Sequence, residues 1–517
     1  MSRRNLLRIS VVLAAAAYLG YSQFKAKPGA ARAETAAPIA ADAKSFTLGT
    51  LQFSACELPQ KRSGATTSAF CAPFQVPERR SENPRDTPDG RKIDLRLALI
   101  KSDAAAADRD IVVFLAGGPG QAAIDTWPQI AGALAPLRRH HHILLLDQRG
   151  TGGSNGLLCK PEKEGEAAPD TLDVASIAGS TRDCLAAVSN KADVRYYTTS
   201  AAVADLEALR QALGSPTLDL IGVSYGTRVA QQYAMRHSEG VRSIVLDSVA
   251  PNELVLGQEF ARNLDDALKA QFAQCSRNPA CAKAFADPYA SLGKLRAALR
   301  AKPETYAFRD PVTFAPLQRR INETNLAGLV RLFAYTPETA ALLPLSIEQA
   351  LHGNFTPLAG QSQLLSGDLA DLSESGMQMS VICSEDADLL MPRPEDADTV
   401  LGNALIEAIH AQCQIWPHGT RPADFHTPLH TDKPVLVLEG EFDPVTPPRY
   451  GEQVMQGFTN AKLIVAHGQG HNVIGRGCIP KVVGEFVDQL EPKQLDVKCV
   501  DALGPTPAFV DFNGAAP

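Results

Sequence analysis

One serine in the chain lies in a pattern typical of an activated nucleophile. Ser224 is the central residue of the pentapeptide G-V-S-Y-G, which follows the apolar run 218–221 and precedes the helix-favouring run 225–237. A strand, a sharp turn and a helix in that order hold a serine hydroxyl out above the edge of a sheet. The two glycines leave room for such a turn. Because so short a pattern also arises by chance, the rest of the chain has to supply its context.

A serine hydroxyl needs a general base, and a third group that orients the base, before it attacks a carbonyl carbon. Asp443 follows the apolar run 434–438, and His471 follows the apolar run 462–465. In open α/β sheets the site residues follow the carboxyl ends of the strands, and one familiar chain order is serine, acid, histidine. We therefore predict that Ser224, Asp443 and His471 form a catalytic triad.

Neighbouring side chains compete for two of these roles. We favour Asp443 as the acid because the proline after it fixes the loop, and His471 as the base because the G-Q-G before it lets the chain reach back over the sheet. The alternatives are Glu439, Glu441 and Asp432 for the acid and His467 for the base.

A tetrahedral intermediate also requires backbone N–H donors. Tyr225, directly after the serine, offers one donor, and the loop G-G-P-G at 117–120, after the apolar run 111–115, offers the other. This loop lacks the lysine and spacing of a phosphate-binding loop. The run of histidines at 140–142 is a poor metal site, because adjacent residues of an extended chain point to opposite faces. We expect no metal and no cofactor.

The apolar runs identify a mostly parallel, doubly wound α/β sheet, because runs without alternation are typical of strands covered on both faces. Between 251 and 430 helix-like segments dominate, and no strand-like run of comparable strength interrupts them. We predict an α/β core at 34–250, a large, mainly helical cap at 251–430, and the rest of the core with a C-terminal tail at 431–517. The predicted strands are 49–54, 94–100, 111–115, 143–146, 218–221, 241–246, 434–438 and 462–465, and the main predicted helices are 200–213 (with Ser200 as its cap), 257–274, 290–301, 325–334, 339–351, 399–413 and 480–489.

The N-terminus is typical of an export signal. Residues 2–8 are basic and carry a twin arginine, the apolar run 9–21 is too short to span a bilayer, and A-R-A at 31–33 offers a cleavage site. We predict cleavage after Ala33 and a periplasmic or secreted protein with no stable membrane association. An uncleaved anchor is the alternative. The net charge of −7 argues against a nucleic-acid partner.

Export makes disulfide bonds plausible for the ten cysteines. Pairing of neighbours along the chain is one of many possible connectivities, and it is favoured here by the short loops it closes. It predicts the pairs Cys56 with Cys71, Cys159 with Cys184, Cys275 with Cys281, Cys383 with Cys413, and Cys478 with Cys499.

With these motifs placed, the sequence resembles the prolyl/tripeptidyl aminopeptidase family of α/β-hydrolases, and most closely its exported tripeptidyl-aminopeptidase-like members. The matching motifs are GGPG at 117–120, DQRGTGGS at 147–154, GVSYGT at 222–227, DPVTP at 443–447 and G-x-G-H at 468–471. Ala116 departs from the pattern, because many relatives carry histidine before GGPG. The resemblance implies an α/β-hydrolase fold and an oxyanion role for the backbone N–H of Gly118.

The resemblance also implies an acidic anchor in the cap for the free N-terminal amine of a peptide substrate. Glu385 aligns best with that anchor, and Asp386 is the second candidate. We predict a serine exopeptidase that releases one, two or three residues from peptides with a free N-terminus. A serine esterase with the same triad is the alternative, and a non-catalytic binding protein on this scaffold is a more distant one. The oligomeric state stays open.

Overall fold

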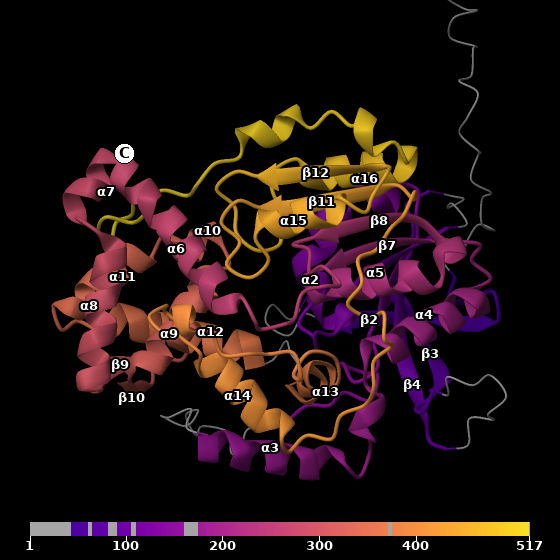
Figure 1. Ribbon diagram of the computed structural model, residues 1–517. Coiled ribbons are helices and arrows are strands. Elements are labelled where there is room, and N and C mark those ends of the chain that lie inside the picture. The colour runs from indigo at the N-terminus through magenta and orange to yellow at the C-terminus, as the bar shows by residue number, and fades with distance from the viewer. Residues whose placement is uncertain are drawn as a thin grey trace, which may run out of the picture. The chain divides into compact units, whose positions relative to one another are not determined.

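A ten-stranded sheet organises the part of the chain that the structure describes (Figure 1). The computed structural model describes residues 43–59, 65–80, 90–104, 110–159, 174–370 and 375–515. The predicted export signal at 1–33, with its cleavage site after Ala33, lies outside these residues. The strands are β1 (Ser45–Leu48), β2 (Leu51–Pro59), β3 (Thr66–Pro77), β4 (Lys92–Ile100), β5 (Ile111–Leu115), β6 (Ile143–Leu146), β7 (Leu218–Val223), β8 (Val241–Asp247), β11 (Val435–Gly440) and β12 (Ala461–Ala466).

The strand order is β1-β2-β3-β4-β6-β5-β7-β8-β11-β12. Pairing is antiparallel from β1 to β6 and parallel from β6 to β12. The parallel strands are the apolar runs without alternation, and every residue of β5, β6, β7 and β11 is buried. The predicted doubly wound sheet is therefore present, with an antiparallel extension whose long strand β3 was not predicted.

Helices cover both faces of the sheet. Successive residues of β5 alternate between two hydrophobic clusters, with Val113 on the side of α4 (Thr199–Leu213), α5 (Tyr225–Arg236) and α15 (Pro448–Met455). Phe114 lies on the side of α2 (Ala123–Leu134) and α16 (Ile479–Gln489). This packing holds the carboxyl ends of the parallel strands at one edge of the sheet.

Two local predictions need correction. The helix predicted from Ser200 is capped by Thr198 instead, whose side chain accepts a hydrogen bond from the Ala201 N–H. The helix ends at Gly214 as expected, in a left-handed conformation with φ of 65°. The predicted strand 49–54 begins in a turn, because Gly49 has a φ of 58° and separates β1 from β2.

The segment between β8 and β11 carries mainly helices and has a hydrophobic cluster of its own. It also contains a two-stranded antiparallel hairpin, β9 (Glu304–Arg309) and β10 (Pro316–Ile321), which the sequence analysis did not predict. Its strands are half exposed and rich in arginine, so their apolar signal is weak. The helices are α6 (Phe260–Arg277), α7 (Pro279–Ala284), α8 (Pro288–Ala301), α9 (Glu323–Phe333), α10 (Pro337–Ala340), α11 (Leu343–Leu351), α12 (Thr356–Ala370), α13 (Ser375–Glu385) and α14 (Ala404–Cys413).

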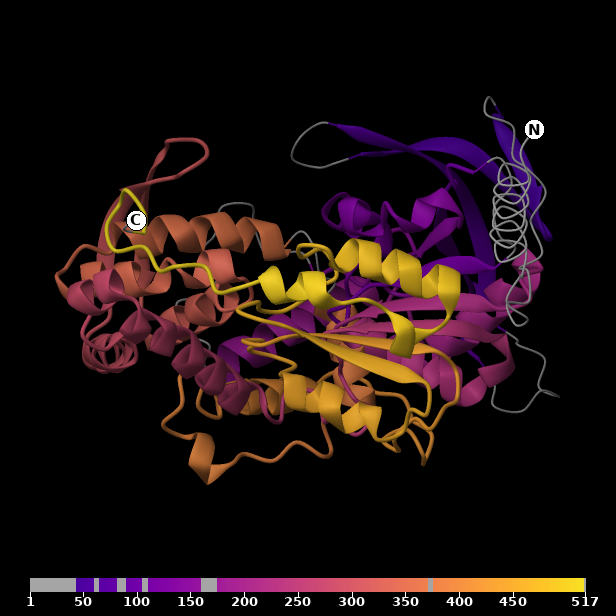
Figure 2. The same cartoon turned by 90° about the horizontal axis from the view of Figure 1, so that it is seen from above.

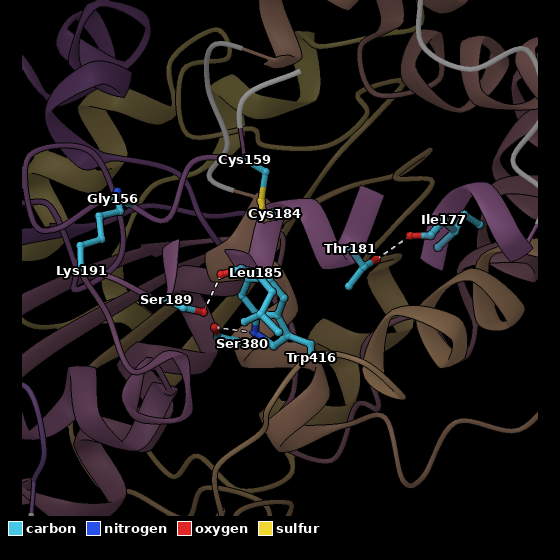
Figure 3. The surroundings of a disulfide bond; sticks show 10 residues. All are labelled: Gly156, Cys159, Ile177, Thr181, Cys184, Leu185, Ser189, Lys191, Ser380 and Trp416. Carbon is cyan, nitrogen blue, oxygen red and sulfur yellow. Dashed lines mark hydrogen bonds between the residues drawn. A yellow bond between two sulfur atoms is a disulfide. The ribbon is translucent and has the colours of Figure 1, made fainter. Parts of the chain in front are cut away.

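Five disulfide bonds join cysteines that are neighbours along the chain, and they are the five pairs that the sequence predicts. Figure 3 shows Cys159 bonded to Cys184 of α3 (Val174–Val188), near the hydrogen bond from Trp416 Nε1 to Ser380 Oγ. Helix α3 packs against α14 and α13. No helix among the described residues is long and apolar enough to cross a membrane.

Candidate active site

Ser224 stands in the turn between β7 and α5. Its backbone has φ of 55° and ψ of −122°, a conformation that is unusual for a residue with a side chain, and its N–H donates to the Asp247 carbonyl oxygen at 2.9 Å. A Cβ on Gly222 would lie 2.5 Å from the Gly226 carbonyl oxygen, and a Cβ on Gly226 would collide with the Leu115 carbonyl. Glycine is thus required on both sides of the serine by the close approach of backbone to backbone.

The structure brings the three predicted triad residues together. His471 Nε2 lies 3.0 Å from Ser224 Oγ, and His471 Nδ1 lies 2.7 Å from Asp443 Oδ2. Asp443 and His471 are buried, while Ser224 is partly exposed. With the Nδ1 proton directed at the carboxylate, Nε2 is free to accept the serine proton.

Asp443 is held by the loop that follows β11. Its Oδ1 accepts hydrogen bonds from the N–H groups of Val445 and Thr446, both at 2.8 Å. Thr446 also donates its hydroxyl to Asp443 Oδ2 at 3.0 Å and lies 3.3 Å from His471 Nδ1. This role of Thr446 was not predicted, although the run D-P-V-T-P places the threonine three residues after the acid.

The alternative acids point elsewhere. Glu439 Oε1 accepts from the Val249 N–H at 3.2 Å, Glu441 accepts from the Gly468 N–H at 2.8 Å, and Asp432 is exposed. The alternative base, His467, has an exposed side chain that lies 3.7 Å from Glu441. Neither His467 nor these three acids makes a hydrogen bond to Ser224 or His471 among the described residues.

The segment between β8 and β11 contributes to the histidine loop. The His471 N–H donates to the Tyr335 carbonyl oxygen at 2.7 Å, and the Tyr335 ring meets the imidazole edge to face at 5.1 Å between centroids. A Cβ on Gly470 would collide with the same Tyr335 carbonyl. Tyr335 therefore helps to set the position of the imidazole. No local sequence pattern predicts this role, because Tyr335 and His471 are distant in the chain.

Both predicted oxyanion groups lie near the serine. Tyr225 is the first residue of α5, where backbone N–H groups have no acceptor within the helix. A Cβ on Gly117 would lie 3.1 Å from the Ser224 Cβ, so the G-G-P-G loop passes directly beside the nucleophile. Gly118 has a φ of 107°, which a residue with a side chain rarely adopts.

The D-Q-R-G-T-G-G-S loop at 147–154 binds the helices next to the nucleophile. Asp147 accepts hydrogen bonds from the N–H groups of Ile124, at the start of α2, and Gly153, at 3.0 and 3.1 Å. Burial raises the pKa of Asp147 to about 6. The Arg149 guanidinium, fully buried, forms a bidentate pair with Asp205 at 2.7 and 2.8 Å. The loop therefore ties α2 and α4 to the edge of the sheet where Ser224 lies.

The two predicted anchor residues lie side by side at the end of α13, and both are fully buried. Glu385 accepts from the N–H and the hydroxyl of Thr199, at 2.5 and 2.7 Å, and that hydroxyl lies 2.6 Å from the Tyr225 hydroxyl oxygen. Burial, and next the charge of Asp386, raise the pKa of Glu385 to about 7. Glu385 is thus linked through the Thr199 hydroxyl to Tyr225, the residue that follows the nucleophile.

Asp386 pairs with a different partner. Its Oδ2 accepts from the Arg228 guanidinium on α5 at 2.9 Å, while Oδ1 has no hydrogen bond among the described residues and lies 3.8 Å from His426 Nε2. Both nitrogens of His426 face backbone carbonyl oxygens, those of Asn252 and Glu385, at 2.9 Å. The one open acceptor of the anchor pair is therefore Asp386 Oδ1.

The histidines at 140–142 have separate partners. His140 and His141 both contact the Asp488 carboxylate, and His142 Nδ1 accepts from the Ser102 N–H at 3.1 Å. Burial lowers the pKa of His142 to about 4. Among the described residues no group of three or more His, Cys, Asp and Glu side chains could hold a metal ion.

Comparison with known proteins adds a family and several relatives. The family model for the alpha/beta hydrolase fold matches residues 110–475. The chain is 27% identical over 226 residues to YuaR of Escherichia coli K12, covering 43% of this chain and 45% of YuaR. It is 30% identical over 229 residues to the serine protease Hip1 of Mycobacterium tuberculosis, covering 41% of this chain and 42% of Hip1.

A third relative matches over more of its length. The chain is 23% identical over 455 residues to the tripeptidyl aminopeptidase of Streptomyces lividans, covering 81% of this chain and 82% of that protein. By contrast, the chain spans less than half of the length of each of the other two relatives, YuaR and Hip1.

Proposed function

The chain belongs to the alpha/beta hydrolase fold family, and on this premise we propose that it is an exported serine exopeptidase acting on peptides with a free N-terminus. The family match confirms the predicted fold class. Within that fold we propose 34–250 and 431–517 as the catalytic core and 251–430 as the cap. The observation that carries the proposal is the contact of His471 with both Ser224 and Asp443.

The proposed reaction proceeds through an acyl-enzyme. Ser224 Oγ attacks the scissile carbonyl carbon while His471 Nε2 takes the hydroxyl proton, and Asp443 stabilises the resulting imidazolium. The N–H groups of Tyr225 and Gly118 would bind the oxyanion. The imidazolium returns its proton to the departing amine, and a water molecule, activated by the same imidazole, then releases the acyl group from Ser224.

The peptidase assignment is supported by the names of two relatives, a serine protease and a tripeptidyl aminopeptidase. We further propose that Glu385 and Asp386 recognise the substrate amine, as the resemblance implies. The unpartnered Asp386 Oδ1 would be the acceptor for an ammonium group, and the buried Arg228 pair would hold the carboxylate in place. We propose export from the basic N-terminus, and the five disulfides fit an oxidising compartment.

The proposal is tested with a serine-directed fluorophosphonate probe and a panel of peptides. We expect labelling at Ser224, its loss in Ser224→Ala, and release of short N-terminal fragments, identified by mass spectrometry, from peptides with free but not acetylated N-termini. Rapid ester hydrolysis with no peptide cleavage would favour the esterase alternative. A folded protein that is not labelled at Ser224 would instead favour a binding role.

The amine anchor has its own test. We expect Asp386→Asn to raise KM for peptides at least tenfold, because an ammonium group loses its charged partner, and to leave the hydrolysis of a neutral ester unchanged. Asp388→Asn is the matched control, since this exposed carboxylate two residues away forms its ion pair with Arg421. Equal effects of Asp386→Asn on peptide and ester turnover would contradict the anchor role.

A further inference from the structure

The β9–β10 hairpin is an arm that extends from the helical segment (Figure 2). Ile321 is buried at its base, Phe308 is buried next to the turn, where it pairs with Leu317, and β9 packs against α12. At its far end the turn 310–315 exposes two large apolar side chains, Val312 with 78% and Phe314 with 70% of its surface accessible. These are the two most exposed large hydrophobic residues in the described part of the chain.

The turn that presents them is held by its own hydrogen bonds. Asp310 Oδ1 accepts from the N–H groups of Val312 and Thr313 at 2.9 and 2.7 Å, and the Asp310 N–H donates to the Ala315 carbonyl oxygen at 2.8 Å. Phe314 adopts a left-handed conformation with φ of 61°. Within the chain its ring meets only the Arg309 guanidinium among the described residues, 6.0 Å from the ring centroid, so most of the ring is available to a partner outside the chain.

Arginines surround this apolar tip. Arg309 and Arg320 are exposed on the strands, and Arg319 is half-buried beside Tyr306. None of the three pairs with a carboxylate among the described residues, and Arg309 Nη1 instead donates to the Phe314 carbonyl oxygen at 3.1 Å. The nearby Asp310 carboxylate is engaged by the N–H groups of the turn. Arg309, Arg319 and Arg320 set against Glu304 and Asp310 give residues 304–321 a net charge of +1, although the whole chain has a net charge of −7.

We propose that this hairpin docks on an anionic lipid surface. Val312 and Phe314 would enter the boundary between headgroups and acyl chains, while Arg309 and Arg320 contact lipid phosphates. A convex tip with two apolar side chains fits a deformable bilayer boundary, whereas a protein partner would have to offer a matching pocket. Charges act over about 8 Å at physiological salt, so a surface against the arm meets the small positive excess of the hairpin rather than the negative charge of the distant parts of the chain.

Such docking is reversible, because two inserted side chains bind far more weakly than a spanning helix. It is therefore compatible with the expectation that the chain has no stable membrane association. It also does not depend on the proposed peptidase activity, since none of the arm's residues belongs to the candidate active site.

The test places a fluorescent reporter on the tip. Trp127 and Trp416 are both buried, so Phe314→Trp adds the only exposed tryptophan in the described part of the chain. With vesicles of phosphatidylcholine and phosphatidylglycerol we expect its emission to shift to the blue and to be quenched by brominated acyl chains. With phosphatidylcholine alone we expect at most a small shift. Met391→Trp is the control, because Met391 is also exposed, at 65%, but lies outside the arm.

Co-sedimentation of the full chain with the same vesicles supplies the second measurement. We expect Val312→Ser with Phe314→Ser to lose binding, and each of Arg309→Gln and Arg320→Gln to weaken it about fivefold at low salt. An unshifted Phe314→Trp emission on anionic vesicles would overturn the proposal. A dimer that the serine variant abolishes, without any vesicle effect, would overturn it in favour of a second copy of the chain.

Discussion

At the scale of single residues, buried carboxyl groups surround the candidate triad. Burial raises the pKa of Glu385 to about 7 and that of Asp247 to about 6, and it raises the pKa of Glu439 well above its usual range. Asp247 accepts from the N–H groups of Val473 and Ile474, so it anchors the chain just after His471. These carboxyl groups make the stability of the site dependent on pH.

Glu385→Gln tests this dependence. The pKa of Glu385 is higher in the folded chain than in the unfolded chain, so the native state binds more protons between pH 4.5 and about 7. The stability of the native state therefore falls as the pH rises through that window. The amide mimics the protonated acid and can keep both contacts with Thr199. We expect the free energy of unfolding of the variant to rise, relative to that of the original chain, by on the order of 3 kcal/mol as the pH increases across this window. Urea unfolding at several pH values measures this difference. A difference that does not change with pH would contradict the raised pKa.

At the scale of elements, the loop after β12 is fixed from two sides. The connection between α9 and α10 contacts it through Tyr335, and the C-terminal segment contacts it where Gln469 Nε2 donates to the Gly504 carbonyl oxygen at 3.1 Å. Arg476 pairs with Glu338 of α10 beyond the histidine. The position of His471 is therefore set by the packing of the helical segment on the sheet.

Gly470→Ala is expected to displace this loop, because the new Cβ would collide with the Tyr335 carbonyl that accepts the His471 N–H. A displacement of about 1 Å can lower the rate about 100-fold. We expect that loss in kcat/KM and in the rate of fluorophosphonate labelling, with the melting temperature changed little. Gly475→Ala is the matched control, since its Cβ would meet only the Ala133 Cβ, at 3.8 Å. Similar rates for both variants would contradict this role of Gly470.

At the scale of the whole molecule, the disulfides are all local. Two of them, Cys275–Cys281 and Cys383–Cys413, lie within the segment between β8 and β11, and the other three lie within the sheet-forming parts. The contacts that join that segment to the sheet are non-covalent, such as the Arg228–Asp386 pair. Each disulfide therefore stabilises its own loop.

Removing disulfides by paired alanine substitutions should reveal this local action. The Cys383–Cys413 bond closes a separation of 30 residues and the Cys275–Cys281 bond one of 6. Chain entropy predicts losses of about 4 and about 2 kcal/mol. We expect this order in the free energies of unfolding, measured with denaturant in the absence of reductant. A larger loss for the shorter loop would contradict it.

The sequence predicted those features that depend on local pattern. β5 and β6 were predicted with the observed bounds, because unbroken apolar runs of strand length have few alternatives. The placement of Ser224, Asp443 and His471 after three strands followed from the parallel arrangement of such strands, whose carboxyl ends meet at one edge. The half-exposed hairpin β9–β10 was not predicted, because polar and arginine residues weaken its apolar signal although burial alternates along both strands.

The sequence by itself therefore determined the buried parallel strands, the strained turn at Ser224 and the order of the candidate triad along the chain, since each strand and turn depends on residues that are close together in the chain. Only the tertiary structure decided which atoms meet. It alone brings Thr446 to His471, the Tyr335 carbonyl to His471, and Thr199 to Glu385. These contacts depend on how distant segments pack against one another, and packing is decided by the shape of the whole interior.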